Sequence, residues 1–344
     1  MPSVNATSDD IREHFKSQGA SCTRLGSPFT GRLCAVLAEL LTQETAFGAQ
    51  VLGWQVDPRA DALALRVCGG LQALSWEDAE LAALYPPHQV ADDEFTQRLG
   101  AWLHAYDSAL IPWLDSAPQT NEVSRSGVLL GGLLHLADNV EIELLEIGSS
   151  AGLNLFPDCY AYDLGEGRSW GDGPVRIVTP WAGNLPPLNR QLRVVSRAGC
   201  DIAPIDLSDP AARMRLRAYV WPDQTARIAR FEAAVAHATA AKPDIAQQGA
   251  AEFLEQRLAD PVPQGRLRVI QHSIMWQYMP LAEQERAEAA IRAAGARGGA
   301  RLAWLRLEAD AQTGTAAILL THFGQGETVE LGRGDFHGRS AHWT

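Results

Sequence analysis

Residues 144–154 read LLEIGSSAGLN, an apolar run that leads into a turn of small residues and then into a second apolar stretch. This pattern predicts a strand, a tight turn and the start of a helix. Gly148 and Gly152 bracket two serines and an alanine, so the backbone can turn sharply and approach a ligand closely. The stretch indicates nucleotide or cofactor binding, with an ordinary strand-to-helix turn as the simpler alternative.

The spacing of the glycines distinguishes between cofactors. The dinucleotide-binding fingerprint places glycine first, third and sixth after its strand, whereas this chain has Gly148, Ser150 and Leu153 there. The segment instead carries an acid, Glu146, two residues before one glycine, and a second glycine four residues after it. This arrangement resembles the first motif of class I S-adenosylmethionine-dependent methyltransferases, with Ser150 where glycine is commonest.

Composition sets limits on partners and location. The chain has 344 residues, enough for one large or two ordinary domains. Its net charge of -12 disfavours nucleic acid as a substrate. The five cysteines are scattered without a Cys-x-x-Cys pair, so we expect neither a disulfide framework nor a metal site. We expect neither a leader nor a membrane span, and we expect a cytoplasmic protein that acts on a small molecule, with its oligomeric state open.

The first part of the chain shows helical periodicity. Apolar residues recur at helical spacing in four segments, and Ser27 before Pro28 supplies a helix start. The four segments are residues 33–41, 63–74, 99–110 and 122–134. The last is apolar on nearly every side, so we expect it to be buried against the following domain. Residues 1–138 are therefore predicted to form an all-helical domain that acts as a lid.

A polar segment, residues 119–126 (QTNEVSRS), precedes the fourth of these helices. Thr120 or Asn121 fits the N-cap position with Glu122 in the first turn, and this capping role explains the segment by itself. The alternative is that the helix start faces the cofactor. In that case Asn121 and Arg125 would contact the ligand.

Residues 139–344 alternate strands and helices, as an α/β domain does. The alternation is interrupted over residues 160–197, which we interpret as an inserted hairpin with short strands at 160–164, 175–178 and 192–196. The next strand ends at Asp201. In nucleotide-binding α/β units, an acid at the end of the second strand accepts hydrogen bonds from the ribose hydroxyls. Asp201 is the first candidate for that role and Asp163 the alternative, unless both acids only cap turns.

The remaining strands complete the predicted sheet. We expect strands at 244–247, 266–271 and 302–307, followed by an antiparallel hairpin of 316–323 and 328–331. Ligands of open α/β sheets bind outside the carboxyl ends of the strands. The polar and aromatic residues after the 266–271 strand, His272, Ser273, Trp276 and Tyr278, are therefore placed to meet a substrate. The predicted fold is a mostly parallel Rossmann-like sheet of methyltransferase type with a C-terminal antiparallel hairpin.

Several strings of the chain also resemble a bacterial family known only by a domain of unknown function. They are QTNE at 119–122, LEIG at 145–148, SAGLNL at 150–155, GCD at 199–201, PID at 204–206, WPDQ at 221–224, HS at 272–273 and WQY at 276–278. The likeness covers nearly the whole chain and implies a methyltransferase-like fold more strongly than a reaction. It gives Asn121, Trp221 and His272 weight beyond capping or packing.

The first functional hypothesis is methyl transfer from S-adenosylmethionine to a small molecule. The sulfonium is already activated, so the protein mainly holds donor and acceptor in line and excludes water. His272 would be the base and Tyr278 a weaker candidate. The expected cofactor contacts are Glu146, Gly148, Ser150, Gly152, Asn154, Asp201 and, at the adenine edge, Gln247 or Gln248. The expected substrate contacts are Asn121, Arg125, Trp221 and Trp276.

Two other functions fit the same residues. One is a non-catalytic sensor or partner subunit that keeps the fold and the cofactor, because fold does not imply function. The other is a hydrolase, since Gly148–Gly152 satisfies Gly-x-Ser-x-Gly in a strand-turn-helix setting. Ser150 would then be the nucleophile and His272 its base. The chain has no His-Gly-Gly type of oxyanion loop upstream, which ranks this function third.

Overall fold

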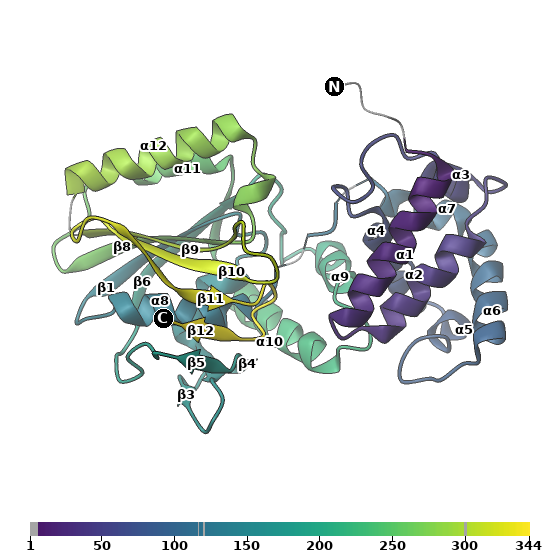
Figure 1. The fold of residues 1–344 in the computed structure, drawn as a ribbon, viewed down its shortest axis with the longest axis horizontal. Helices are drawn as coiled ribbons and strands as arrows, with labels where there is room; N and C mark the ends of the chain where they lie inside the picture. Colours follow the sequence, from purple (N-terminus) through teal and green to yellow (C-terminus); the bar gives the residue numbers. More distant parts are fainter. Residues whose placement is uncertain (1–5, 116, 120, 299–300) are drawn as a thin grey trace. The chain divides into compact units, whose positions relative to one another are not determined.

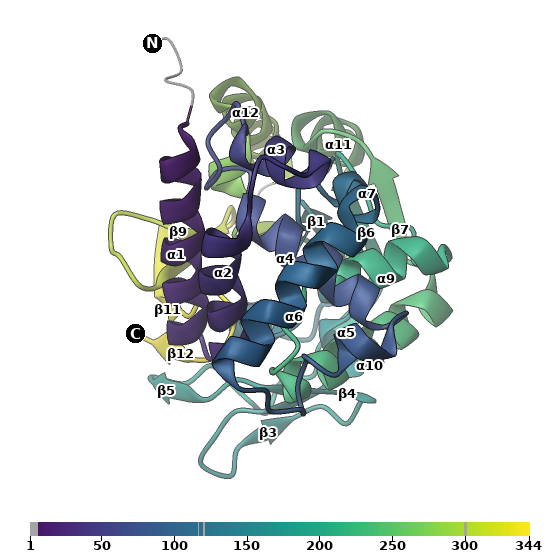
Figure 2. The same ribbon diagram turned by 90° about the vertical axis from the view of Figure 1, so that its right-hand side faces the viewer.

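The computed structural model describes residues 6–115, 117–119, 121–298 and 301–344. The chain divides into two compact units, whose elements are labelled in Figures 1 and 2. The first unit comprises Met1–Thr120 and Asp209–Ala229, and the second comprises Asn121–Ser208 and Arg230–Thr344. The division therefore lies near residue 120 instead of 138, and a later segment returns to the first unit.

The first unit is built from helices in the part that the structure describes. Its elements are α1 (Ser8–Arg24), α2 (Pro28–Leu40), α3 (Ala46–Leu52), α4 (Leu63–Ser75), α5 (Ala79–Ala82), α6 (Asp92–Ala105), α7 (Asp107–Leu110), η1 (Ile111–Trp113) and α9 (Pro210–Ala218). The predicted start of α2 is confirmed, because the Ser27 side chain accepts a hydrogen bond from the backbone N–H of Thr30. The chain passes from the first unit to the second within α10 (Thr225–Ala241).

The glycine pair inside α4 does not break the helix. A Cβ atom at Gly69 would lie 2.6 Å from the ring of Tyr219, and one at Gly70 would lie 2.8 Å from Trp113. The two glycines therefore let aromatic rings pack directly against the helix backbone. This close approach offsets the lower helix propensity of glycine.

The second unit is organised on a mixed nine-stranded sheet with the order β5-β12-β11-β10-β9-β8-β1-β6-β7. Its strands are β1 (Glu141–Ile147), β5 (Trp181–Gly183), β6 (Arg193–Asp201), β7 (Asp244–Gln247), β8 (Arg266–Ser273), β9 (Leu302–Ala309), β10 (Ala316–His322), β11 (Thr328–Gly334) and β12 (Ala341–Trp343). Strands β7, β6, β1, β8 and β9 run parallel to one another. The expected C-terminal hairpin is confirmed as β10 and β11.

Helices cover both faces of this sheet (Figure 1). On one face, Leu145, Ile147 and Ile270 share an apolar core with residues of α11 (Ala250–Arg257) and α12 (Leu281–Gly298). On the other face, α8 (Arg125–Leu136) packs against β9 and β10. α8 is buried on almost every side, as its sequence predicts. Its packing on the sheet explains why it belongs to the second unit and not to the helical one.

The connection from β1 to β6 differs from the expected strand, turn and helix. The turn is followed only by the short 3-10 helices η2 (Leu153–Leu155) and η3 (Pro157–Cys159). Pro157 explains this, because the residue before a proline is disfavoured in the α conformation. The chain then forms a separate three-stranded sheet, β3-β2-β4, from β2 (Tyr160–Asp163), β3 (Ser169–Trp170) and β4 (Val175–Val178).

The predicted strand at 192–196 is not part of this insertion. It is the first half of β6, which runs unbroken over nine residues and pairs with β1 in the large sheet. The inserted segment therefore ends before Arg193 instead of at 197. None of the helices in the described residues is long and apolar enough to cross a bilayer.

Candidate site at the carboxyl ends of the strands

The turn after β1 has a left-handed backbone at alternate residues. The φ angles are +65° at Gly148, +52° at Ser150 and +72° at Gly152. Glycine adopts this conformation readily, whereas a serine does so at a cost in free energy. Ser149 ties the turn to the neighbouring strand, because its backbone N–H (3.0 Å) and its hydroxyl (3.3 Å) both donate to the carbonyl of Cys200.

Asp201, the last residue of β6, lies directly beside this turn. Its Oδ2 atom accepts a hydrogen bond from the Ser150 N–H at 2.9 Å, and its Oδ1 atom accepts one from Ala203 at 2.9 Å. Each carboxylate oxygen can accept a further hydrogen bond. Asp163 instead ends β2 of the small sheet, where it pairs with Arg176 at 2.9 Å. Of the two candidate acids, Asp201 is therefore the one that adjoins the glycine turn.

Asn121 holds the turn from its other side. Its Nδ2 atom donates to the Ser149 carbonyl at 3.1 Å, and its Oδ1 atom accepts from the Leu153 N–H at 2.8 Å. The residue is only 8% exposed. Asn121 thus caps no helix, since α8 begins at Arg125, and its amide is committed to the turn instead of to a ligand. Thr120, the other capping candidate, lies outside the described residues.

We expect Asn121→Ala to destabilise the protein by about 1–3 kcal/mol, because it leaves the buried N–H of Leu153 without an acceptor, whereas the Ser149 carbonyl keeps the Gly152 N–H as a donor. Urea denaturation measures the change. Asn189→Ala is the matched control, since Asn189 is exposed and surface substitutions change stability by no more than about 0.5 kcal/mol. A loss for Asn121→Ala no larger than that of the control would contradict this role.

Three buried polar side chains lie together on the α8 face of the sheet. Glu146 on β1 is opposite Gln271 on β8. Gln271 donates from Nε2 to the Asn154 carbonyl at 3.0 Å, and Asn154 donates from Nδ2 to the Glu122 carbonyl at 3.3 Å. Glu146 and Asn154 are 2% exposed and Gln271 is fully buried. Glu146 and Asn154 therefore do sit behind the turn, as expected, but water does not reach them.

The oxygen ends of these side chains have no hydrogen-bond partner among the described residues. The atoms are Oε2 of Glu146, Oδ1 of Asn154 and Oε1 of Gln271. Each of the two amides donates from its nitrogen to a backbone carbonyl. These hydrogen bonds decide which end of each amide is the nitrogen and which is the oxygen. Burial raises the pKa of Glu146 to about 8, against a smaller lowering by Gln271 and Arg125. Glu146 is thus mainly protonated at neutral pH.

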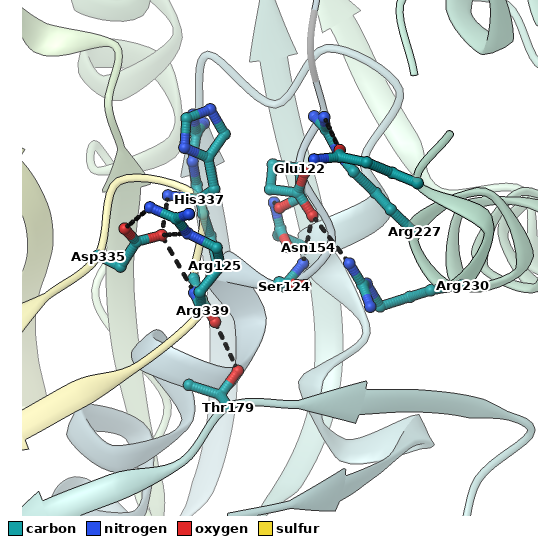
Figure 3. A network of polar contacts seen from close by, with 12 residues as sticks. Glu122, Ser124, Arg125, Asn154, Thr179, Arg227, Arg230, Asp335, His337 and Arg339 are labelled. Atoms are coloured by element: carbon teal, nitrogen blue, oxygen red, sulfur yellow. Dashed lines mark hydrogen bonds and ion pairs between the residues drawn. The ribbon is translucent and has the colours of Figure 1, made fainter. Parts of the chain in front are cut away.

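A polar network surrounds the start of α8 (Figure 3). The buried Glu122 carboxylate lies 3.7 Å from the Arg230 guanidinium and accepts a hydrogen bond from the Ser124 N–H at 3.1 Å. Arg125 donates from Nε to the Phe336 carbonyl at 2.9 Å and from NH1 to the Ser273 carbonyl at 3.3 Å. Arg125 therefore joins the end of β8 to the loop that follows β11.

The C-terminal loop of this network was not identified from the sequence. Asp335 pairs with Arg339 at 2.6 Å and also accepts a hydrogen bond from the His337 N–H at 2.9 Å. A Cβ atom at Gly338 would lie 2.2 Å from the backbone of Ser124, so the loop packs directly on the start of α8. No local pattern signals this contact, because the two segments are more than 200 residues apart.

His272 lies on the opposite face of the sheet from Glu146. Its side chain is fully buried, and Nδ1 is 2.6 Å from Oε1 of Glu308 on β9. The ring stacks on Trp276 with a centroid distance of 5.0 Å and an interplanar angle of 20°. Side chains alternate along a strand, so Gln271 faces α8 and His272 faces α12. His272 is therefore not exposed to a substrate at the crevice, and Glu308 is the partner that sequence reasoning missed.

The segment after β8 covers part of the glycine turn. A Cβ atom at Gly148 would lie 2.9 Å from the Met275 side chain, and the Met275 N–H donates to Glu308. Ile274 has a φ of +50°, which is rare for a β-branched residue and marks a strained connection. Tyr278 is 73% exposed and touches solvent instead of the turn. Trp276 is half-buried against His272.

Gln247 ends β7 and adjoins both Asp201 and a cavity. Its Nε2 atom donates to the Ile202 carbonyl at 3.4 Å, and the Ile202 side chain is 78% exposed. A cavity of about 640 Å³ lies beside it, lined by Ala151 of the turn, residues 204–208, the end of α10 and β7. Its walls are mainly apolar, and its volume is in the range of small-molecule pockets. Trp221 belongs to the first unit, where it is buried below the guanidinium of Arg227.

Comparison with known proteins identifies the family. A family model described as an uncharacterized protein conserved in bacteria, DUF2332, matches residues 12–343. The chain belongs to the DUF2332 family. No curated protein and no solved structure was found to match it. The family match covers both units, in agreement with the likeness of the strings along the whole sequence.

Proposed function

We propose that this member of the DUF2332 family binds S-adenosylmethionine at the carboxyl ends of β1, β6 and β7 and transfers its methyl group to a small molecule. The observation that carries the proposal is the hydrogen bond of 2.9 Å between Asp201 and the Ser150 N–H. This hydrogen bond joins an acid at the end of β6 to the glycine turn at the end of the neighbouring strand, β1. This pairing suits a ligand that combines a ribose with a polar chain.

The strand order supports the same location. From β1 the chain continues to β6 and β7 on one side, and then returns to β8 and β9 on the other. The two loops that leave β1 and β8 therefore diverge, and such a topological switch point is where open α/β sheets bind ligands. Gly148 follows β1 at this point, and Ser273 ends β8.

Each part of the cofactor has a candidate partner. The free lone pairs of Asp201 would accept hydrogen bonds from the ribose hydroxyls. The exposed Ile202 side chain offers an apolar surface to the purine ring, with Gln247 next to it for the polar edge. The backbone of Gly148, Ser150 and Gly152 would lie along the amino-acid part.

Methyl transfer requires little covalent chemistry from the protein. The acceptor lone pair forms a bond to the methyl carbon, the carbon–sulfur bond breaks with its electrons left on sulfur, and the acceptor loses a proton. The protein would hold the reactants in line and exclude water. His272 reaches an acceptor only if the segment 274–279 moves, because Trp276 stacks on it, whereas Tyr278 of the same segment is exposed.

A non-catalytic sensor that binds the same cofactor is the second candidate. The observation that favours it is the closure around the turn, where Met275 covers Gly148 and His272 is fully buried. Transfer of a labelled methyl group from S-adenosylmethionine to any small-molecule acceptor would rule the sensor out.

The hydrolase function has less support. His272 Nε2 has no hydrogen-bond partner among the described residues, so the Ser150 hydroxyl does not bond to it. We therefore expect serine-directed fluorophosphonates to leave the protein unlabelled, as measured by intact mass. Labelling of the parent protein that disappears in Ser150→Ala would favour the hydrolase function over methyl transfer and over the sensor.

Calorimetric titration tests the cofactor. We expect S-adenosylmethionine and S-adenosylhomocysteine to bind, and NAD and ATP to bind at least about a hundredfold more weakly. A ligand at about a hundred times its dissociation constant adds roughly 2.7 kcal/mol of stability, so a melting shift gives an independent check. A folded sample that binds neither adenosyl compound would refute the proposal.

A further inference from the structure

The buried pair Glu146 and Gln271 contains two acceptor oxygens that have no hydrogen-bond partner in the described part of the chain. The residues are opposite each other on adjacent parallel strands, so their side chains leave the same face of the sheet. One N–H of the Gln271 amide donates to the Asn154 carbonyl, and Oε1 of Gln271 and Oε2 of Glu146 are both unpartnered within the described chain. A proton on the carboxyl group would give Glu146 an O–H, which is the kind of donor that Oε1 of Gln271 lacks.

The surroundings favour this neutral form. Burial is the largest influence on the pKa of Glu146 and outweighs the lowering by the Gln271 side chain and by Arg125 on α8, and the Asp201 carboxylate adds to the rise. Arg125 also donates to the carbonyls of Ser273 and Phe336. These two acceptors compete with the Glu146 carboxylate for the positive charge of the guanidinium. Cys200 on β6 and Tyr160 on β2 are the other titratable groups that interact with this carboxyl, and burial raises the pKa of both.

We propose that Glu146 stores a proton shared with Gln271 and releases it when a small organic cation, a sulfonium or an ammonium, binds at the Gly148–Gly152 turn. The inference rests on the proposed function, because that turn is where the cofactor would bind. A cation beside the turn stabilises the ionised carboxylate by Coulomb attraction in a medium of low dielectric constant. The released proton goes to solvent.

The charge on sulfur would affect the Glu146 proton differently for the methyl donor and for its product. S-Adenosylmethionine carries a positive charge on sulfur, whereas S-adenosylhomocysteine has a neutral thioether there. When the carbon–sulfur bond breaks, the charge that favours the carboxylate disappears and Glu146 takes up one proton from solvent. The site would thus distinguish donor from product by charge, and so favour exchange of product for fresh donor.

Calorimetry in buffers of different ionisation enthalpy measures this proton. We would titrate the protein at pH 7 in phosphate and in Tris with S-adenosylmethionine, S-adenosylhomocysteine and sinefungin, which carries an ammonium at the place of the sulfonium. With a pKa of about 8, Glu146 holds about 0.9 proton at pH 7. We expect the two compounds that are cationic at this place to release most of it and the thioether to release little.

The dissociation constants should follow the same linkage. Between pH 6 and 7.5, the dissociation constant of S-adenosylmethionine should fall by about tenfold per pH unit, and that of the thioether should stay nearly constant. Glu146→Gln should abolish both the proton release and the pH dependence, because an amide cannot ionise. Asp163→Asn is the matched control and should keep both, since Asp163 lies exposed on the small sheet.

The outcomes are separable. Equal proton release by donor and thioether, or undiminished release in Glu146→Gln, would overturn the inference and leave the cofactor proposal standing. Failure of all three compounds to bind would overturn both. An infrared band of a protonated carboxyl group, present at pH 6, lost at pH 10 and absent in Glu146→Gln, tests the stored proton without any ligand. Absence of that band in the parent protein would also overturn the inference.

Discussion

At pH 8, Glu146→Gln is expected to be more stable than the parent protein by on the order of 4 kcal/mol, apart from any constant difference between the two at low pH. The reason is the burial that raises the pKa of this carboxyl from 4.5 to about 8. Between these values the native state holds a proton that the unfolded state has lost. The free energy of unfolding of the parent therefore falls as the pH rises through this window, whereas the glutamine variant has no proton to lose here.

Urea denaturation of both proteins at pH 5, 6, 7 and 8 measures this effect as a difference, which removes the contribution of the other titrating groups. The difference should grow with pH and level off above about pH 8. Asp163→Asn serves as the control, because the pKa of Asp163 is lowered by Arg176 and does not enter the window. A stability difference that stays constant from pH 5 to 8 would mean that Glu146 is ionised in the free protein.

The second large effect is expected on binding. Asp201→Ala should weaken the binding of S-adenosylhomocysteine by at least about a hundredfold, which corresponds to about 3 kcal/mol, because two hydrogen bonds between a carboxylate and the ribose hydroxyls are lost. The substitution also removes the acceptor of the Ser150 N–H, so the turn itself loses a support.

Two comparisons separate these causes. Asp201→Asn keeps an acceptor for the Ser150 N–H but removes the charge, so it should fold like the parent and still bind weakly. Binding of 2′-deoxyadenosine compounds should already be weak in the parent and should change little in either variant. Unchanged affinity of Asp201→Asn and Asp163→Asn alike would remove both acids from the proposed ribose site.

The candidate site has a buried polar pair on each face of the large sheet. The Glu146 and Gln271 pair faces α8, whereas the His272 and Glu308 pair faces α12 and anchors the segment that covers Gly148. Any reaction that uses His272 therefore requires movement of this segment, and the strained backbone of Ile274 marks the place where it joins β8.

The sequence by itself determined the local elements of the second unit. The apolar run before Gly148 forms β1, the glycines take up the left-handed backbone that the turn needs, and the segment that is apolar on all sides becomes the buried α8. Residues 316–323 and 328–331 form the hairpin that their alternation predicts. Each of these features follows from residues that are close together in the chain, so the sequence pattern contains the necessary information.

Only the tertiary structure decided which polar residues meet. β6 pairs with β1 and brings Asp201 to the turn, whereas β2 pairs with β4 and keeps Asp163 in another sheet. The register of β8 and β9 joins His272 to Glu308, and side-chain alternation then turns His272 away from Glu146. The physical reason is that strand pairing and register are set by burial and backbone hydrogen bonds between distant segments, which no local pattern encodes.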